Sequence, residues 1–467
     1  PAVYEMFRAK LDCQCTQTCR SRKVQLTAAA PTVAGSHAFG NLIMHPVQPV
    51  ITLCNSASRR QVTGRASATQ GLPADRGIDV VGFGNLCVDT VLPWEQLPPA
   101  NVHVRRQLLD TLTSSPPHHS YWEVGGNCNF MVAAARLGLR VASVGHIGTD
   151  VYGNFMDNVL RGIRTLPGEA MEVLRTARAV FTNGFIFDEL PLAAVETACS
   201  DAIEHGAAIF FDPGPRCQTM LEGPRRAALN LLLDLSSVVL MTEEEARVVT
   251  GLDDPQAAAE WVLARPGARA QWVVIKMGSQ GALLCERNRS NNGSSRSSGG
   301  GAANGQGNGR GHGCDYTGAA SSAETTTSPA ATARVTRLGA VKVEVVDTVG
   351  CGDSFAAAVV MGYISGWPAD VTLALANAVG GATATGRGAG RNVAQLERVL
   401  ALLAEGAAGA ADTAACGPEA AGRQRVAFAR ARALLLQSLE SRRPEQGNEQ
   451  QGGREEGRRQ EQLSAAA

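Results

Sequence analysis

The sequence predicts an α/β protein built on a doubly wound, mostly parallel sheet with helices on both faces. Three observations lead to this fold class. From about residue 78, short apolar runs rich in β-branched residues alternate with longer segments of helical periodicity. The runs are apolar throughout, which is typical of strands buried on both faces of a sheet. Glycines stand directly after several helical segments, where they end helices.

The expected strands and helices follow one another along the chain. Helices are predicted over residues 130–137, which Gly138 ends, and over 243–249, which Gly251 ends. Together with the strands they predict one large folded domain over residues 78–403. The predicted strands are residues 80–83, 141–144, 179–182, 208–211, 238–241 and 272–275.

The composition is that of a globular protein. Of its 467 residues, 44% are hydrophobic and 18% are charged. Lys plus Arg and Asp plus Glu both number 43, so the formal net charge is +0 and no global field attracts nucleic acid or an anionic membrane. The chain has no apolar stretch of about 18 residues that would span a bilayer. We therefore expect no nucleic-acid partner and no membrane partner.

Three segments differ from the domain in composition. Residues 1–77 are basic, acid-poor and rich in Ser, Ala and Thr, which predicts a disordered transit segment for a plastid or other organelle. A merely disordered extension on a cytoplasmic protein is the alternative. Residues 288–331 read as a low-complexity insertion within the domain, and 404–467 as an Ala/Gly-rich, then Arg/Glu/Gln-rich tail. That tail contains a predicted helix over 425–439.

The twelve cysteines are scattered along the chain, which favours reduced thiols. Cys13, Cys15 and Cys19 form the one tight cluster, but a zinc site there would need a fourth ligand. Cys351 is interpreted first as a small turn residue, and a redox-sensing thiol is the weaker alternative.

The strongest local motif is Gly350-Cys351-Gly352-Asp353. It lies between the run Val345-Val346 and an apolar helical run over residues 356–364, so a strand should enter the turn and a helix should leave it. Glycines let consecutive backbone N–H groups converge, and the helix N-terminus adds partial positive charge. The motif therefore predicts an anion hole of the kind that phosphoryl transfer requires.

Asp353 would project from the first helical turn beside the bound anion. A carboxylate of ordinary pKa can accept the proton of an attacking hydroxyl as the attack proceeds, and it can orient that hydroxyl. We therefore predict that Asp353 is the catalytic base. The alternative is a simple helix cap after a tight turn.

Two motifs together carry a family resemblance. Asp347 to Asp353 fits the pattern Asp-Thr-x-Gly-x-Gly-Asp, and Gly125-Gly126-Asn127-Cys128-Asn129 begins a second motif that continues to Asp150. In this order they resemble the ribokinase-like (PfkB) family of carbohydrate and nucleoside kinases. The run Gly-Gly-Asn-Cys-Asn is similar to a plant-type branch. The resemblance extends from about residue 79 to about residue 403, without the insertion.

The resemblance implies a substrate site and a small β lid. Asp89, Gly126 and Asn129 would bind the hydroxyls of a sugar or nucleoside, although the glycines could form only a turn that Asn127 or Asn129 caps. In this family the lid also supports dimers, so a homodimer is a candidate assembly. Because residues 163–171 form only a short connection, the lid is expected to be reduced or missing.

The resemblance also implies ATP and Mg²⁺ as cofactors and K⁺ as a further cation. Thr242 replaces an asparagine of the family pattern but keeps one donor and one acceptor, and Glu245 would organise Mg²⁺ indirectly. If the family resemblance is left aside, this segment is simply the start of a helix whose first residues are acidic. Asp212 and Arg216 are expected to face the same cleft. The nucleotide-binding residues implied are Thr242, Glu245, Lys276, Gly278, Gly281, Asn377 and Gly388, and those for the monovalent cation are Asp347, Val349 and Asn392.

Other readings are less consistent with the sequence. Gly82-Phe83-Gly84 follows a strand, but Cys87 stands where a dinucleotide fingerprint has its third glycine. The chain has no G-x-x-x-x-G-K-[ST] loop, which excludes P-loop kinases. The remaining rival is a non-catalytic plastid regulatory or scaffold protein with the same fold. Which sugar or nucleoside is bound is not encoded in these motifs.

Overall fold

The structure, a computed structural model, describes residues 5–11, 48–53, 77–94, 101–148, 150–161, 170–288, 333–412 and 418–442. Most of the predicted transit segment lies outside the described residues. So do nearly all of the low-complexity insertion, the Cys13–Cys15–Cys19 cluster and most of the short connection over 163–171.

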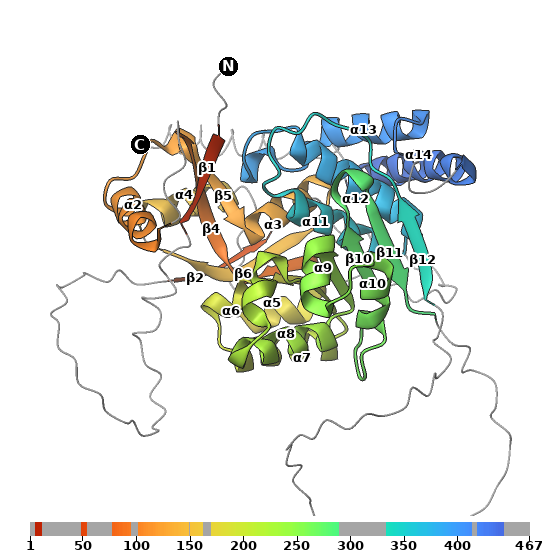
Figure 1. The fold of residues 1–467 in the computed structure, drawn as a ribbon. Helices are drawn as coiled ribbons and strands as arrows, with labels where there is room; N and C mark the ends of the chain where they lie inside the picture. The colour runs from red at the N-terminus through yellow and green to blue at the C-terminus, as the bar shows by residue number, and fades with distance from the viewer. Residues whose placement is uncertain are drawn as a thin grey trace, which may run out of the picture.

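The main sheet has nine strands in the order β12-β11-β10-β9-β8-β7-β3-β6-β2 (Figure 1). The strands from β6 to β10 pair in parallel, and β2, β11 and β12 are antiparallel to their neighbours. The six predicted strands are confirmed as β3 (Ile78–Phe83), β6 (Val141–Ile147), β7 (Ala177–Asn183), β8 (Ala208–Asp212), β9 (Val238–Thr242) and β10 (Trp272–Lys276). The others are β2 (Gln48–Leu53), β11 (Ala282–Glu286) and β12 (Arg334–Leu338).

Helices cover both faces of this sheet, so the doubly wound class is confirmed. Neighbouring strand residues serve opposite faces, since Val80 and Phe181 belong to one core while Val81 and Val180 belong to the other. Figure 1 shows α13 above the sheet and α7 and α8 below it. The first core includes α3 (Asn127–Arg136), α11 (Cys351–Ile364), α12 (Ala369–Ala384), α13 (Leu396–Ala408) and α14 (Pro418–Ser441). The second includes α5 (Ala170–Thr176), α7 (Leu192–Glu204), α8 (Gly223–Leu235), α9 (Glu243–Thr250) and α10 (Pro255–Leu263).

The order of the strands reverses at β3. The chain moves from β3 to β6 on one side and then returns to β7 on the other side. In such sheets the crevice for a ligand lies beyond the carboxyl ends of the strands at this reversal. The predicted site residues Asp212, Thr242 and Lys276 are the last residues of β8, β9 and β10.

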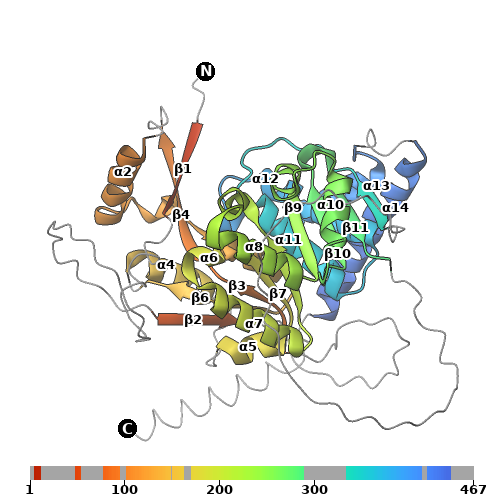
Figure 2. The same cartoon turned by 60° about the horizontal axis from the view of Figure 1, so that its bottom comes forward.

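A second, antiparallel sheet consists of β1 (Glu5–Leu11), β4 (Leu86–Trp94) and β5 (Trp122–Gly126). Figure 2 shows it beside the main sheet, with α2 (Val102–Ser114) next to it. A small second sheet is therefore present. β1 and β2 also correct the prediction that residues 1–77 are disordered throughout, because β1 pairs with β4 and β2 pairs with β6. Open strand edges offer backbone hydrogen bonds to any extended segment, whatever its composition.

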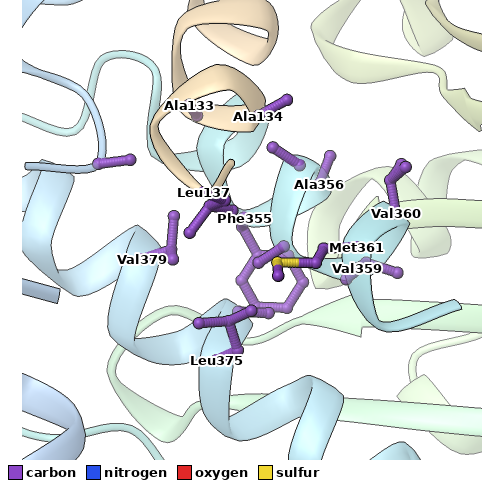
Figure 3. Close-up of a cluster of buried hydrophobic side chains, with 14 of the residues drawn as sticks. Ala133, Ala134, Leu137, Phe355, Ala356, Val359, Val360, Met361, Leu375 and Val379 are labelled. Carbon is purple, nitrogen blue, oxygen red and sulfur yellow. The ribbon is translucent and has the colours of Figure 1, made fainter. Parts of the chain in front are cut away.

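Helices α3 and α11 lie against each other through small side chains. Figure 3 shows Ala133 and Ala134 of α3 close to Ala356 of α11, and Phe355 pointing toward Leu375 of α12. All five side chains are at most 6% exposed. Alanines let the two helix axes approach closely, and this contact brings the start of α3 next to the start of α11.

Two expectations about the C-terminal half need correction. No strand enters the glycine turn, because Val345 and Val346 are 59% and 50% exposed and only their neighbour Val341 forms an isolated bridge, to Ala411. The packed body also continues past residue 403: α14 contains the predicted helix 425–439, and its Phe428 is fully buried.

Candidate active site

The glycine turn at residues 350–352 begins helix α11. Gly350 is the N-cap with φ 77°, a left-handed conformation that favours glycine, and a Cβ there would lie 2.9 Å from Cγ1 of Val393. Cys351 and Gly352 form the first helical turn, whose backbone N–H groups have no partner within the helix, although the Cys351 N–H donates to the carbonyl of Thr348 at 3.2 Å. The turn therefore has the donors and the dipole that an anion hole requires.

Asp353 lies in the same first turn, half-buried. Its Oδ2 accepts a hydrogen bond of 3.2 Å from Nδ2 of Asn129, at the start of α3. The other end of the Asn129 amide, Oδ1, accepts the backbone N–H of Gly390 at 2.8 Å. Asn129 is buried and fixed from both sides, so it sets the position of the Asp353 carboxylate.

Lys276 brings a positive charge to the turn. Its Nζ lies 2.5 Å from Oδ2 of Asp212, and a Cβ built on Gly352 would lie 3.5 Å from the same Nζ. The ammonium group is thus next to the first turn of α11. A phosphoryl group held there would meet backbone donors on one side and an ammonium on the other.

The pKa values in this cluster shift through burial and mutual interaction. Burial would lower the pKa of Lys276, but the carboxylates of Asp212, Glu245 and Asp353 outweigh it and raise that pKa. Burial and the charge of Asp212 raise the pKa of Glu245, against the opposing effect of Lys276. Lys276 is therefore firmly cationic, and Glu245 is the carboxylate that takes up a proton more readily than usual.

Thr242 and Glu245 form a capping box at the start of α9. The Thr242 backbone N–H donates to Glu245 Oε2 at 2.8 Å, and the Glu245 N–H donates to Thr242 Oγ1 at 3.2 Å. The replacement of asparagine by threonine therefore suits the helix start. The structure therefore contains the acid-rich helix start of the alternative interpretation. The Glu245 carboxylate in this segment also interacts electrostatically with Lys276.

Asp89 lies on β4 and is fully buried. A Cβ on Gly125 would come within 2.5 Å of Asp89 Oδ2, so the glycine lets the carboxylate lie against the β5 backbone. Burial, then the charges of Asp89 and Asp353, raise the pKa of Cys128, which places this thiol near both carboxylates. Asp89 and Asp353 thus both lie near Cys128 of α3.

Gly126 adopts φ 60° at the N-cap of α3, where a Cβ would lie 2.4 Å from Oδ1 of Asn85. The next residue, Asn127, is fully buried and accepts a 2.9 Å hydrogen bond from Nδ2 of Asn183, at the end of β7. Sequence reasoning missed Asn183 as well as Gly390, the backbone partner of Asn129. No motif marks either residue.

Asp347 organises the loop before the turn. Its Oδ1 accepts the Val349 N–H at 3.0 Å and its Oδ2 accepts the Gly388 N–H at 2.8 Å. The side chain of Asn392 donates to the carbonyl of Arg387. The residues predicted for the monovalent cation therefore belong to neighbouring loops, and the Asp347 carboxylate is already occupied by two backbone donors.

The remaining nucleotide residues lie at the start of β11 and on α12. Gly278 and Gly281 have positive φ values, and a Cβ on Gly281 would lie 2.0 Å from the carbonyl oxygen of Leu338. Asn377 is buried, and its Nδ2 donates to the carbonyls of Leu338 and Gly339 at 3.0 and 3.1 Å. Asn377 thus supports the backbone that packs against this loop.

Arg216, which was expected to face the cleft, forms a 2.8 Å ion pair with Asp188 and lies over the ring of Phe185. Within the described residues, no three His, Cys, Asp or Glu side chains gather in a way that could hold a metal ion. None of the helices described in the structure is long and apolar enough to cross a membrane.

Comparisons with known proteins agree with the motifs. The sequence pattern described as "pfkB family carbohydrate kinase" matches residues 164–297 and 327–395, a span that includes the Asp347–Asp353 motif and follows the Gly125–Asp150 motif. No curated protein matches the chain at the sequence level.

Several solved structures are similar to this chain in fold. An Arabidopsis thaliana ribokinase complexed with ribose and ATP is 16% identical, with 70% of this chain and 98% of that chain covered and a TM-score of 0.46. A Xylella fastidiosa fructokinase with bound ATP is 17% identical, with 70% of this chain and 98% of that chain covered and a TM-score of 0.46. A Sinorhizobium meliloti adenosine kinase is 18% identical, with 68% of this chain and 97% of that chain covered and a TM-score of 0.48. Likenesses at this level carry no argument about substrate.

The matched segments contain Asp212, Glu245, Lys276 and the turn with Asp353, which are the charged residues around the glycine turn, whereas Asp89 lies outside them. The plant-type branch stays a prediction. Residues 164–297 and 327–395 of the chain are similar to the pfkB family of carbohydrate kinases.

Proposed function

We propose that this protein is an ATP-dependent kinase that phosphorylates a hydroxyl of a sugar or nucleoside-like substrate. One observation carries the proposal: Asp353 stands in the first turn of α11 directly after the glycine turn, with the Lys276 ammonium beside that turn. A purely structural protein has no need for a carboxylate, an ammonium and a helix N-terminus at one point.

In this proposal each residue has one task. The backbone N–H groups of residues 350–352 and the Lys276 ammonium stabilise the charge that spreads over the transferred phosphoryl oxygens. Asp353 orients the attacking hydroxyl and accepts its proton as the new O–P bond forms. Asn129 holds the Asp353 carboxylate in position through its hydrogen bond.

Mg²⁺ fits the donor set near the turn. Asp212 and Glu245 supply hard carboxylate oxygens, and Mg²⁺ typically takes one or two such ligands in addition to phosphates and water. When bound, it would neutralise part of the phosphate charge. The donors for the ATP phosphates would be the glycine turn and Lys276, with the loop from Gly278 to Gly281 as the neighbouring wall.

The experiment is a coupled assay of ATP consumption by the purified chain against a panel of sugars and nucleosides, with Mg²⁺ and K⁺ present. We expect turnover with at least one hydroxyl substrate. The Asp353→Asn variant should lower kcat by about 10²- to 10⁴-fold while ATP still binds, which is the usual range for a positioned base. Asp110→Asn, an exposed carboxylate on α2, is the matched control.

One observation favours the alternative, a non-catalytic regulatory or scaffold protein. Asp89, the residue proposed to bind substrate hydroxyls, is fully buried, so a substrate could reach it only if the structure around β4 moves. Absence of turnover with the whole panel, in a folded protein that binds ATP, would favour this alternative.

Three further parts of the proposal have their own tests. If K⁺ binds near Asp347 and Val349, turnover should be faster in K⁺ than in tetramethylammonium.

If the protein is a homodimer, light scattering should give twice the mass of one chain. Delivery to a plastid or other organelle predicts that residues 1–77 direct a fluorescent fusion there, whereas the cytoplasmic alternative predicts no redistribution.

A further inference from the structure

A cavity of about 300 Å³ lies at the far edge of the main sheet, away from the residues proposed for catalysis. Its wall consists of all five residues of β12, of Asp370 in the first turn of α12, and of Ala420, Arg423 and Gln424 near the start of α14. β12 is the last strand of the sheet, and Figure 1 shows it at the outer edge, below α14. None of the residues that line it belongs to the proposed kinase site.

The cavity carries an excess of positive charge. Among the described residues, Arg334, Arg337 and Arg423 line it, against the one carboxylate of Asp370. Arg334 has only a 3.8 Å ion pair with Glu286, and its side chain is 75% exposed. Among the residues that the structure describes, Arg423 has no carboxylate partner. Asp370 is partly engaged, because its Oδ1 accepts the backbone N–H of Val371.

Two helices begin at this cavity. Asp370 stands in the first turn of α12, a helix of 16 residues, and Ala420 stands in the first turn of α14, a helix of 24 residues. The N–H groups of a first helical turn have no partner within the helix, and the helix dipole adds partial positive charge there. The start of α14 therefore adds to the field of the three arginines, whereas at the start of α12 the Asp370 carboxylate accepts the Val371 N–H and offsets this effect.

The far wall is firmly held. Gln424 is 3% exposed, and its Oε1 accepts the Gly339 N–H at 3.3 Å while its Nε2 donates to the carbonyl of Asp412 at 3.1 Å. These bonds fix α14 against the end of β12. The backbone positions of Arg423 on α14 and Arg337 on β12 are thus set by the fold.

We propose that this cavity binds a phosphorylated small molecule at a site separate from the kinase site. Planar guanidinium groups donate in pairs to phosphate oxygens, and helix N-termini bind phosphate for the same electrostatic reason. A volume of about 300 Å³ is at the lower end of small-molecule pockets, which suits a phosphate group with a short organic part. The hydroxyl of Thr336 adds a neutral donor and acceptor to the wall.

The test is direct binding, independent of kinase activity. Glycerol 3-phosphate is titrated into the full chain by calorimetry, with glycerol as the uncharged match. Arg337→Gln/Arg423→Gln should weaken the binding at least about tenfold, since two charge-assisted hydrogen-bond donors are lost. Both arginines are exposed, so the variant should keep its fold, which circular dichroism checks. Arg430→Gln/Arg432→Gln, exposed on the same helix, is the matched control and should bind like the parent chain.

A second measurement separates this site from the glycine turn, which could also bind phosphate. Lys276→Met should keep the binding that Arg337→Gln/Arg423→Gln removes. Hydrogen exchange with the ligand present should slow at residues 334–338 and 420–424.

The proposal fails if Arg337→Gln/Arg423→Gln binds glycerol 3-phosphate as tightly as the control does, or if Lys276→Met, shown by circular dichroism to be folded, has lost all binding. It also fails if a hexaglutamate peptide binds at these arginines and glycerol 3-phosphate cannot displace it, because the cavity would then be a peptide site.

Discussion

The side-chain amide of Asn129 donates a hydrogen bond to the carboxylate of Asp353, which lies 224 residues further along the chain. The pair joins the two motifs that carry the family resemblance. It exists because the alanines of α3 and α11 allow the two helix starts to meet (Figure 3).

This pair predicts a change in the pH dependence of turnover. Asn129→Asp would place a second carboxylate beside Asp353, and like charges raise the pKa of one member of the pair. Because the base must be ionised, the acid limb of the kcat/KM profile should move to higher pH. Asn129→Ala should lower kcat about tenfold with no such movement, since it removes orientation without adding charge. An unmoved acid limb in Asn129→Asp would contradict the role of Asp353.

The glycines of the turn should respond differently to alanine. Gly350→Ala requires a left-handed conformation and brings a Cβ within 2.9 Å of Val393, so we expect a loss of about 1–2 kcal/mol in unfolding free energy. At Gly352 a Cβ meets only the Lys276 ammonium, at 3.5 Å, and alanine suits a helix. Gly352→Ala should therefore keep its stability in urea unfolding but lower kcat/KM for ATP about a hundredfold. Equal activity of Gly352→Ala and the parent chain would show that no anion occupies this space.

The buried pair of Lys276 and Asp212 predicts a stability difference that depends on pH. Removing one member of a buried pair leaves an uncompensated charge, so Lys276→Met should cost about 3 kcal/mol near neutral pH. The pKa of Lys276 is raised, so its contribution is complete below the ordinary lysine value of 10.5 and is lost as the pH rises through the raised pKa.

Urea unfolding of both chains across this range measures the effect. The difference in unfolding free energy between the parent chain and Lys276→Met should stay constant up to about pH 10 and shrink above it. Lys342→Met, at an exposed lysine, should show no difference at any pH. A difference that grows above pH 10 would have the wrong sign for a raised lysine pKa.

Helix α14 should contribute to the stability of the whole domain. Phe428 is fully buried, and a Cβ on Gly406 of α13 would lie 2.5 Å from its ring, so the ring lies directly on the α13 backbone. Phe428→Ala should lower the unfolding free energy by about 3–5 kcal/mol. Val426→Ala, on the same helix but 57% exposed, should change it by less than about 0.5 kcal/mol. Equal values for the two variants would mean that α14 does not pack as the structure has it.

The parallel strands could be predicted because burial on both faces leaves a direct trace in the sequence. Residues such as Val80, Val81, Phe210 and Phe211 must all be apolar when each faces a core. The order of the strands then places Asp212, Thr242 and Lys276 at one edge, since each is the last residue of its strand. For these polar residues, the motif and the topology point to the same place.

Other features could not be predicted from local patterns. The strands over 5–11 and 48–53 depend on backbone pairing with β4 and β6, which leaves no required side-chain pattern. The exposed Val345 and Val346 look like a strand because valine favours strands, but the segment has no partner strand. The contact of Asn129 with Gly390 depends on how two distant loops meet, and spacing in the sequence carries no signal of that.

Helix α14 (Pro418–Ser441) carries Gln424 beside the end of β12 and ends next to Arg442, which pairs at 2.7 Å with Asp79 at the beginning of β3. A recombinant fragment that stops at residue 395, where the family match ends, would lack all of this helix. It would expose to water the apolar surface that Phe428 and Leu435 normally cover, and such fragments are prone to aggregate. Expression boundaries for this protein therefore belong beyond Arg442.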